Sequence, residues 1–221
     1  MADFTSTFAA EETPADGATF DSAKFVAGPG SWERVSTTTG ACFTGVPDTY
    51  TAFRLSTSSP GGTVGSDQYA ECIIQGIGTS RWFGPAVRIQ GTGANQGACY
   101  AAEVTQTTEF RIYRYADAGS ITDNLLSTIS FTPVNGQLVR IQVVGSTIKL
   151  FVDAVEKASI TDATLTGGQP GGWFYAGAST ANMTSWGGGD LAAPPVTIYP
   201  ENFFQVATPL SHWRRNLVTS Y

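Results

Sequence analysis

Two glutamates come closest to a catalytic pair in this chain. Glu103 and Glu109 are separated by a short, mostly polar stretch. A pair of carboxylates can cleave a glycosidic bond when one protonates the leaving oxygen and the other acts as nucleophile or base. A turn is expected between these two residues, which favours two separate surface carboxylates. No catalytic residue is therefore predicted, and the chain is expected not to be an enzyme.

The other catalytic and metal-binding patterns are weaker. His212 is the only histidine, and it lies among aromatic residues near the end of the chain, where a Ser–His–Asp triad is not expected. The sequence contains neither a phosphate-binding GxxxxGK loop nor an HExxH zinc motif. No metal site and no cofactor are predicted. Calcium remains the alternative, because aspartates at loop ends could supply oxygen ligands, although each alone is more often a turn residue; these are Asp117, Asp123, Asp153 and Asp162.

Aromatic side chains could bind a sugar by stacking on its ring, with polar groups beside them. Trp82 is the strongest candidate, because it follows Arg81 in a stretch expected to be a loop. The candidates are Arg81, Trp82, Tyr113, Tyr115, Trp173, Tyr175 and Trp186. The alternative is that most of these aromatic residues pack on or between sheets. Three arginines, Arg88, Arg111 and Arg140, occupy polar positions of successive strands and could line one face of a sheet.

Residues 138–177 are expected to form the central strands of the fold that positions these side chains. Apolar and polar residues alternate over 138–144, 147–153 and 155–161, which predicts three antiparallel strands. Gly145-Ser146 is typical of a two-residue hairpin turn, and a second reversal is expected at Asp153-Ala154. Further strands at 8–12-residue spacing, with almost no helical periodicity before residue 205, predict an all-β, two-sheet antiparallel jelly-roll sandwich.

This stretch resembles the laminin-G-like branch of the concanavalin A-like lectin/glucanase superfamily. Its first half is matched by Gly136, Val139, Arg140, Ile141, Val143, Gly145, Ser146, Ile148, Lys149, Phe151, Val152 and Asp153. Its second half is matched by Asp162, Leu165, Gly168, Pro170 and Gly171, whereas Ala154 stands where the family usually has glycine. The resemblance implies a concanavalin A-like jelly roll over residues 1–186, in which a short strand near residues 3–7 pairs with a late strand. Glucanases of the superfamily carry an E-x-D-x-x-E run, which this sequence lacks. The fold also occurs in lectins, adhesion modules and phage virion proteins, so it does not fix a function.

Composition restricts the partners. Charged residues make up only 14% of the 221 residues and the net charge is −6, so a nucleic acid is not expected as a partner. No stretch approaches the roughly 20 apolar residues of a membrane span, so no membrane partner is predicted. The cysteines, Cys42, Cys72 and Cys99, are odd in number, which favours three thiols over the alternative of a Cys72–Cys99 bridge.

The end of the chain has a different composition. Residues 187–195, GGGDLAAPP, are expected to form a linker, and residues 196–221 an apolar tail. Thr208-Pro209 could begin a short helix in that tail. The tail is predicted to dock on a partner subunit, with its own domain as the alternative, through Phe203, Phe204, Leu210, Trp213, Arg214, Arg215, Leu217 and Tyr221.

Two hypotheses about function follow. The first is a non-catalytic structural protein on a bacteriophage virion, as a capsid decoration, collar or tail-associated protein that contacts itself or other virion subunits. It rests on a starting methionine without a signal peptide, the weakly charged composition and the apolar tail. It implies assembly in a host cytoplasm, with an extracellular location as the alternative. The second hypothesis is a carbohydrate-binding module for host or environmental polysaccharide.

Overall fold

The computed structural model shows an all-β sandwich. It describes residues 3–6, 25–27, 32–34, 42–44, 49–57, 63–77, 81–90, 98–105, 108–115, 124–176 and 182–191. All regular elements in these ranges are strands, and no helix is present among them, which confirms the predicted fold class. Within the same ranges there is accordingly no helix of the length and apolar character that crossing a membrane requires.

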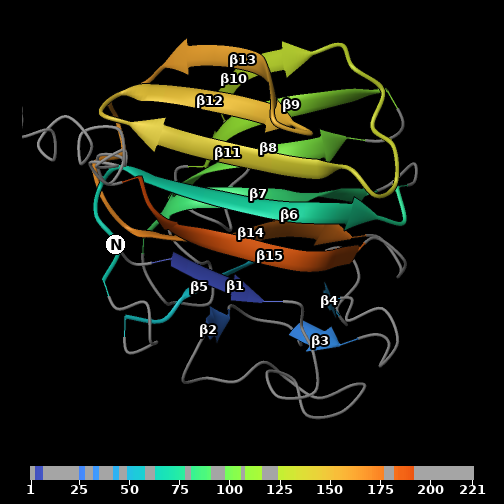
Figure 1. Ribbon diagram of the computed structural model, residues 1–221, viewed down its shortest axis with the longest axis horizontal. Coiled ribbons are helices and arrows are strands. Elements are labelled where there is room, and N and C mark those ends of the chain that lie inside the picture. Colours follow the sequence, from blue (N-terminus) through green and yellow to red (C-terminus); the bar gives the residue numbers. More distant parts are fainter. Residues whose placement is uncertain are drawn as a thin grey trace, which may run out of the picture.

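Sheet A forms the front layer of Figure 1. In spatial order it contains β13 (Val155–Thr161), β12 (Thr147–Val152), β11 (Leu138–Val144), β6 (Gln68–Gln75), β15 (Asn182–Asp190), β4 (Cys42–Thr44) and β3 (Trp32–Arg34). An additional strand, β1 (Asp3–Ser6), pairs antiparallel with β15, so the predicted pairing of an N-terminal strand with a late strand is confirmed.

Sheet B lies behind sheet A (Figure 1). Its order is β10 (Asn124–Ile129), β9 (Glu109–Tyr115), β8 (Cys99–Thr105), β7 (Arg81–Ile89), β14 (Gln169–Ala176), β5 (Thr49–Leu55) and β2 (Phe25–Ala27). Arg81 and Trp82 therefore begin a strand, and the prediction that they lie in a loop is wrong. All strand pairs in both sheets are antiparallel, and non-consecutive strands lie side by side, as in a jelly roll.

The core between the sheets follows the predicted alternation. Ile141, Ile148 and Leu150 are completely buried, whereas Arg140 and Lys149 project from the opposite face of sheet A. The Gly145-Ser146 turn joins Val144 to Thr147, with Gly145 at a positive φ of 56°. Glycine at the first central position is typical of a type II′ turn.

The second hairpin turn has one residue, Ala154, that does not favour its geometry. Asp153 and Ala154 have φ angles of 50° and 65°, in the left-handed region, and they connect Val152 to Val155. Left-handed geometry at both central residues is typical of a type I′ turn, which is usually formed by Asn-Gly or Asp-Gly. Ala154 therefore carries a steric cost that glycine would avoid.

The glycines Gly187, Gly188 and Gly189 lie inside β15, a central strand of sheet A. The prediction that they begin a linker is wrong in this respect. The side chain of Trp186 explains part of the glycine requirement, since a Cβ at Gly188 would lie 2.6 Å from that ring. The rest of the expected linker and the apolar tail lie outside the described residues.

Cys72 and Cys99 are buried as thiols rather than joined by a disulfide, which excludes the alternative pairing. They lie in different sheets, Cys72 in β6 and Cys99 in β8. Burial raises the pKa of the Cys72 thiol, with a further contribution from the charge of Glu71. Both residues therefore serve as small apolar side chains.

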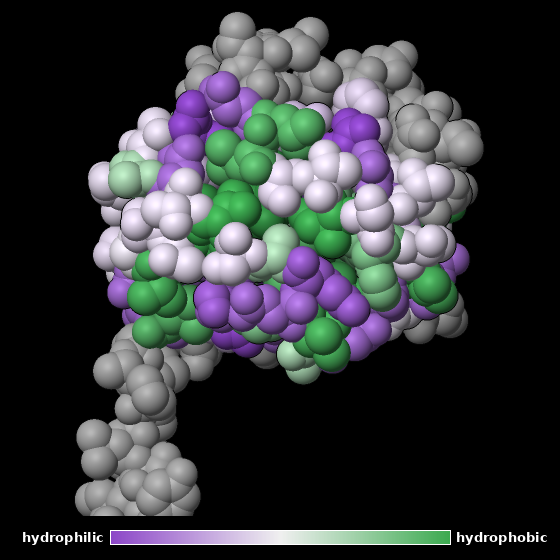
Figure 2. Space-filling view, turned by 90° about the horizontal axis from the view of Figure 1, so that it is seen from above, coloured by the Kyte–Doolittle hydropathy of each residue, from purple (hydrophilic) through white to green (hydrophobic). Residues whose placement is uncertain are grey.

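The two sheets leave an apolar edge where β13 and β10 lie at the top of Figure 1. Figure 2 looks onto this edge and shows apolar side chains among polar ones. Leu125 of β10 is 48% exposed and Val155 of β13 is 56% exposed. Below them, Leu126, Ile129 and Ile160 are partly buried against the core. Exposed and partly buried apolar side chains thus lie along this edge.

Candidate functional site

The outer face of sheet B, the face turned away from sheet A, is buried to an unusual degree. An antiparallel sheet commonly leaves one face to solvent, yet every residue of β8 is buried. The outward positions form a second apolar cluster, separate from the core between the sheets. Its buried members are Ala52, Ala86, Ile89, Cys99, Ala101, Tyr115 and Trp173, with Tyr113 packed against them.

Three aromatic rings form a stack on this face. The rings of Trp173 and Tyr115 have centroids 4.0 Å apart and planes 25° apart, and Tyr113 stacks on Tyr115 at 5.6 Å. Trp173 and Tyr115 come from β14 and β9, with β7 and β8 between them. Their rings meet because the intervening outward residues include alanines, Ala86 and Ala101, that leave room above the sheet.

A buried carboxylate lies next to the stack. Glu103 of β8 is only 1% exposed, and the hydroxyl of Tyr115 donates a hydrogen bond to its Oε1 atom. Arg111 of β9 is directly opposite Glu103 in the strand register. Tyr115 therefore has two roles on this face, because its ring belongs to the stack and its hydroxyl fixes the carboxylate.

A second carboxylate, Glu109, belongs to the same polar group. Arg111 donates to Glu109 Oε1 through Nε at 2.6 Å and to the Tyr113 hydroxyl through Nη1 at 3.3 Å. Burial acts to lower the pKa of Arg111, but the hydrogen bonds to Tyr113 and Glu109 raise it overall. Thr105, directly opposite Glu109, donates weakly to it at 3.5 Å.

The expectation of two separate surface carboxylates is wrong. Glu103 and Glu109 lie on adjacent strands and point to the same face of sheet B, because the turn between them folds β9 back along β8. Glu103 is opposite Arg111 and Glu109 is opposite Thr105, which makes the two glutamates diagonal neighbours. Such neighbours have Cα atoms about 7–8 Å apart.

Four of the predicted sugar-binding residues gather on this face. Tyr113, Tyr115 and Trp173 form the stack. Trp82 is half-buried and pairs with Thr105 across β7 and β8, so alternation with the buried Phe83 places it on the same face. For Arg81 and Tyr175 the structure describes the backbone, which pairs β7 with β14. Trp186 is instead buried in the core between the sheets.

Sequence reasoning did not assign Glu103, Thr105 and Arg111 to this site. The signal was present, because Glu103, Thr105 and Arg111 occupy the same-face positions of two alternating strands. The arginine prediction is wrong for a related reason: Arg111 alone lies on this face. Arg140 projects from sheet A, while Arg88 is 2% exposed and bound among loops.

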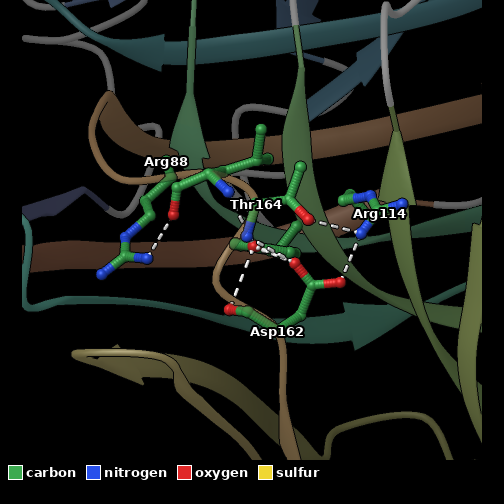
Figure 3. A network of polar contacts seen from close by, with 6 residues as sticks. Arg88, Arg114, Asp162 and Thr164 are labelled. Carbon is green, nitrogen blue, oxygen red and sulfur yellow. Dashed lines mark hydrogen bonds and ion pairs between the residues drawn. The ribbon is translucent and has the colours of Figure 1, made fainter.

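The loop network around Arg88 has a structural role. Arg88 donates to the carbonyls of Ser66 and Gly145 at 2.9 and 2.8 Å and to that of Leu165. Burial lowers the pKa of its guanidinium, against the opposing effects of Tyr100 and Asp67. Figure 3 shows this arginine near the segment that carries Asp162 and Thr164. The guanidinium of Arg88 thus connects the loops at this end of the sandwich.

Asp162 is occupied in the same network rather than open to a metal. Its carboxylate accepts hydrogen bonds from the Tyr100 hydroxyl and the Thr164 amide, at 2.7 and 2.8 Å, and an ion pair from Arg114 (Figure 3). Asp153 accepts from the Leu138 amide at 3.0 Å. No group of three metal-ligating side chains occurs among the described residues, a range that excludes Asp117 and Asp123.

No protein-family model and no curated protein sequence match the chain. Several solved structures are similar to the chain. A carbohydrate-binding module, CBM66 from Bacillus subtilis, is similar at a TM-score of 0.53 and 15% identity, over 76% of this chain and 93% of that one. A prokaryotic β-1,3-1,4-glucanase (lichenase) from a mouse hindgut metagenome gives 0.52 and 12%, over 86% and 99%. The Crh5 transglycosylase gives 0.53 and 10%, over 86% and 85%.

The fold is that of the concanavalin A-like jelly rolls. At these identities the similarity shows the fold alone. The similar structures do overturn the expectation that the chain is not an enzyme. That expectation is wrong as an exclusion, because a lichenase and a transglycosylase share this fold and because Glu103 and Glu109 point to the same sheet face.

Proposed function

We propose that the outer face of sheet B binds a glycan. One observation carries the proposal: stacked aromatic rings and a carboxylate–arginine group share a single sheet face. Sugar rings present apolar C–H faces to aromatic rings and hydroxyl groups to polar side chains, so both kinds of group are needed together. Similarity to a carbohydrate-binding module and to glycan-acting enzymes supports this choice.

The exposed fraction of each side chain indicates whether it supports the face or contacts the glycan. Trp173 and Tyr115 are 0% and 3% exposed, so they support the face from below. Tyr113 and Trp82 are half-buried and can contact a ligand. Arg111 and Glu109, whose side chains are 33% and 21% exposed, supply donors and acceptors for hydroxyl groups.

Binding to a panel of immobilised polysaccharides tests this proposal. Tyr113→Ala and Trp82→Ala should each weaken retention by about tenfold, since one sugar–aromatic stack is lost in each case. Val144→Ala, at an exposed position of sheet A, is the matched control and should bind normally. Unchanged binding in both aromatic variants would contradict the proposal.

Glycoside cleavage is a second candidate function, favoured by the diagonal placement of Glu103 and Glu109. Two carboxylates across a glycosidic bond can act as acid and as nucleophile or base, and the separation of the two carboxyl groups differs between the retaining and inverting mechanisms. Release of reducing ends from the polysaccharides that bind, lost in Glu103→Gln and in Glu109→Gln, would support it. Cleavage that survives in both variants would contradict it.

The virion hypothesis and the docking tail remain predictions. In that reading the sugar-binding domain is carried on a phage particle, and the tail attaches it to another subunit or to a second copy. Deleting residues 196–221 should then leave the sandwich folded and abolish oligomers or particle attachment. If the truncated protein assembles like the full chain, the tail has no such role.

A further inference from the structure

The outer face of sheet A, opposite the proposed glycan face, carries a cavity of about 280 Å³. Its walls come from β6, β11, β12 and the turn after β12. The lining residues are Glu71, Leu138, Arg140, Gln142, Phe151 and Ala154. Ligand pockets usually measure about 300–1,000 Å³, so this volume suits a small molecule or a single sugar ring.

Strand register explains why these side chains converge. Arg140 lies between Glu71 on one neighbouring strand and Phe151 on the other. Leu138 and Gln142 are two residues before and after Arg140 on the same strand, so they share its face. The cavity thus has an arginine at its centre, a carboxylate and an amide beside it, and apolar side chains as the remaining wall.

The guanidinium of Arg140 is held but not saturated. Its centre lies 4.0 Å from the ring centroid of Tyr69, a cation–π contact that fixes its plane. Its Nη1 atom is 3.5 Å from Glu71 Oε2, long for a charge-assisted hydrogen bond. Its Nε atom is buried and has no hydrogen-bond partner. Buried polar atoms nearly always have a partner, so a shift of the side chain that brought this donor to a ligand acceptor would satisfy it.

Arg140 is also the cation best placed to attract an anion into the cavity. Lys149, on the same face of the sheet, is engaged by Glu156 at 2.8 Å and does not line the cavity. A planar guanidinium with an unused in-plane donor matches the two oxygens of a carboxylate. Glu71 disfavours a ligand with two negative charges, and it accepts hydrogen bonds from the hydroxyl groups of a ligand.

We propose that this cavity binds a uronic acid residue. Its carboxylate accepts from the Nε edge of Arg140, its hydroxyl groups donate to Glu71 and bond to Gln142, and one face of its ring packs on Phe151 and Leu138. The site is independent of the glycan surface on sheet B, since it is built from the other sheet.

The experiment is an NMR titration of the ¹⁵N-labelled full chain with D-glucuronate, with D-glucose as the neutral ligand of similar size. D-glucuronate should shift the amide signals of β6, β11 and β12 near Glu71 and Arg140. D-glucose should bind about tenfold more weakly or not at all, because the charge-assisted bidentate contact is missing.

Arg140→Lys keeps the positive charge and removes the planar fork, so it should weaken D-glucuronate binding by about tenfold. Lys149→Gln removes a cation from the same face outside the cavity and should leave the affinity unchanged. Equal binding of D-glucose, equal weakening by both variants, unchanged affinity in Arg140→Lys, or no shifts at β6, β11 and β12 would each overturn the proposal. A normal melting temperature of Arg140→Lys ensures that loss of binding is not loss of folding.

Discussion

Replacing Tyr115 by phenylalanine tests whether the buried carboxylate and the aromatic stack form one unit. The substitution removes the hydroxyl that donates to Glu103 and leaves the ring, stacked 4.0 Å from Trp173, in place. Glu103 is 1% exposed, so water cannot readily replace the lost donor. A hydrogen bond to a charged group contributes about 1.5–3 kcal/mol to stability.

For a chain of this length, a loss of about 2 kcal/mol lowers the melting temperature by roughly 4–8 °C. Tyr113→Phe is the matched control. Its hydroxyl accepts a weaker bond of 3.3 Å from Arg111 at a half-buried position, so a loss of under about 0.5 kcal/mol is expected. Calorimetry and urea unfolding of both variants measure the difference.

A double-mutant cycle isolates the interaction energy between Tyr115 and Glu103. Combining Tyr115→Phe with Glu103→Gln should cost less than the sum of the two single changes, by about 1 kcal/mol or more. Equal stability of Tyr115→Phe and Tyr113→Phe, together with additive effects in the cycle, would refute the reasoning.

Three further predictions concern the sandwich itself. Ala154→Gly should stabilise the protein by about 0.5–1 kcal/mol in thermal unfolding, because it relieves a left-handed alanine; a loss of stability would contradict this. Ile141→Ala should cost about 2–5 kcal/mol and Arg140→Ala under about 1 in urea unfolding, since only the former faces the core; equal costs would contradict that. Burial acts to raise the pKa of Asp162, but hydrogen bonds from Tyr100 and Thr164 and the charge of Arg114 lower it overall, so its stabilisation should be present above about pH 4 and lost as the pH falls through the lowered value. Urea midpoints at pH 3 and pH 6 should therefore differ less in Asp162→Asn than in the wild type, and an unchanged difference would contradict the assignment.

Local alternation was enough to predict the strands and both turns between residues 138 and 161, because each strand there has one buried and one polar face. Tyr113, Tyr115 and Trp173 were named from residue type alone, and Trp82 also from its place after Arg81. Their common face depends on the order of β9, β8, β7 and β14, which no local pattern contains. The placement of Glu103 and Glu109 on the same face depends on the same cross-strand register.

Arg88 shows where alternation fails. Ala86 pairs with Gly171 and Ile89 with Gln169, so β7 has one residue more than β14 between these pairs. Arg88 takes up the difference with a positive φ of 53°. The bulge turns the arginine into the loops and moves Ile89 to the outer cluster. Similarly, the glycines of β15 suggested a linker because glycine has no preference for strands. Pairing with β6 is what keeps them extended.

The central claim is that the outer face of sheet B binds a glycan, and an NMR titration with an oligosaccharide from a polysaccharide that binds in the panel tests it most directly. The account predicts that the amide shifts concentrate on β7, β8 and β9, around Trp82, Glu103 and Tyr113, and that Tyr113→Ala raises the ligand concentration needed to produce them by about tenfold. Shifts confined to sheet A, or no binding by any polysaccharide of the panel, would contradict it.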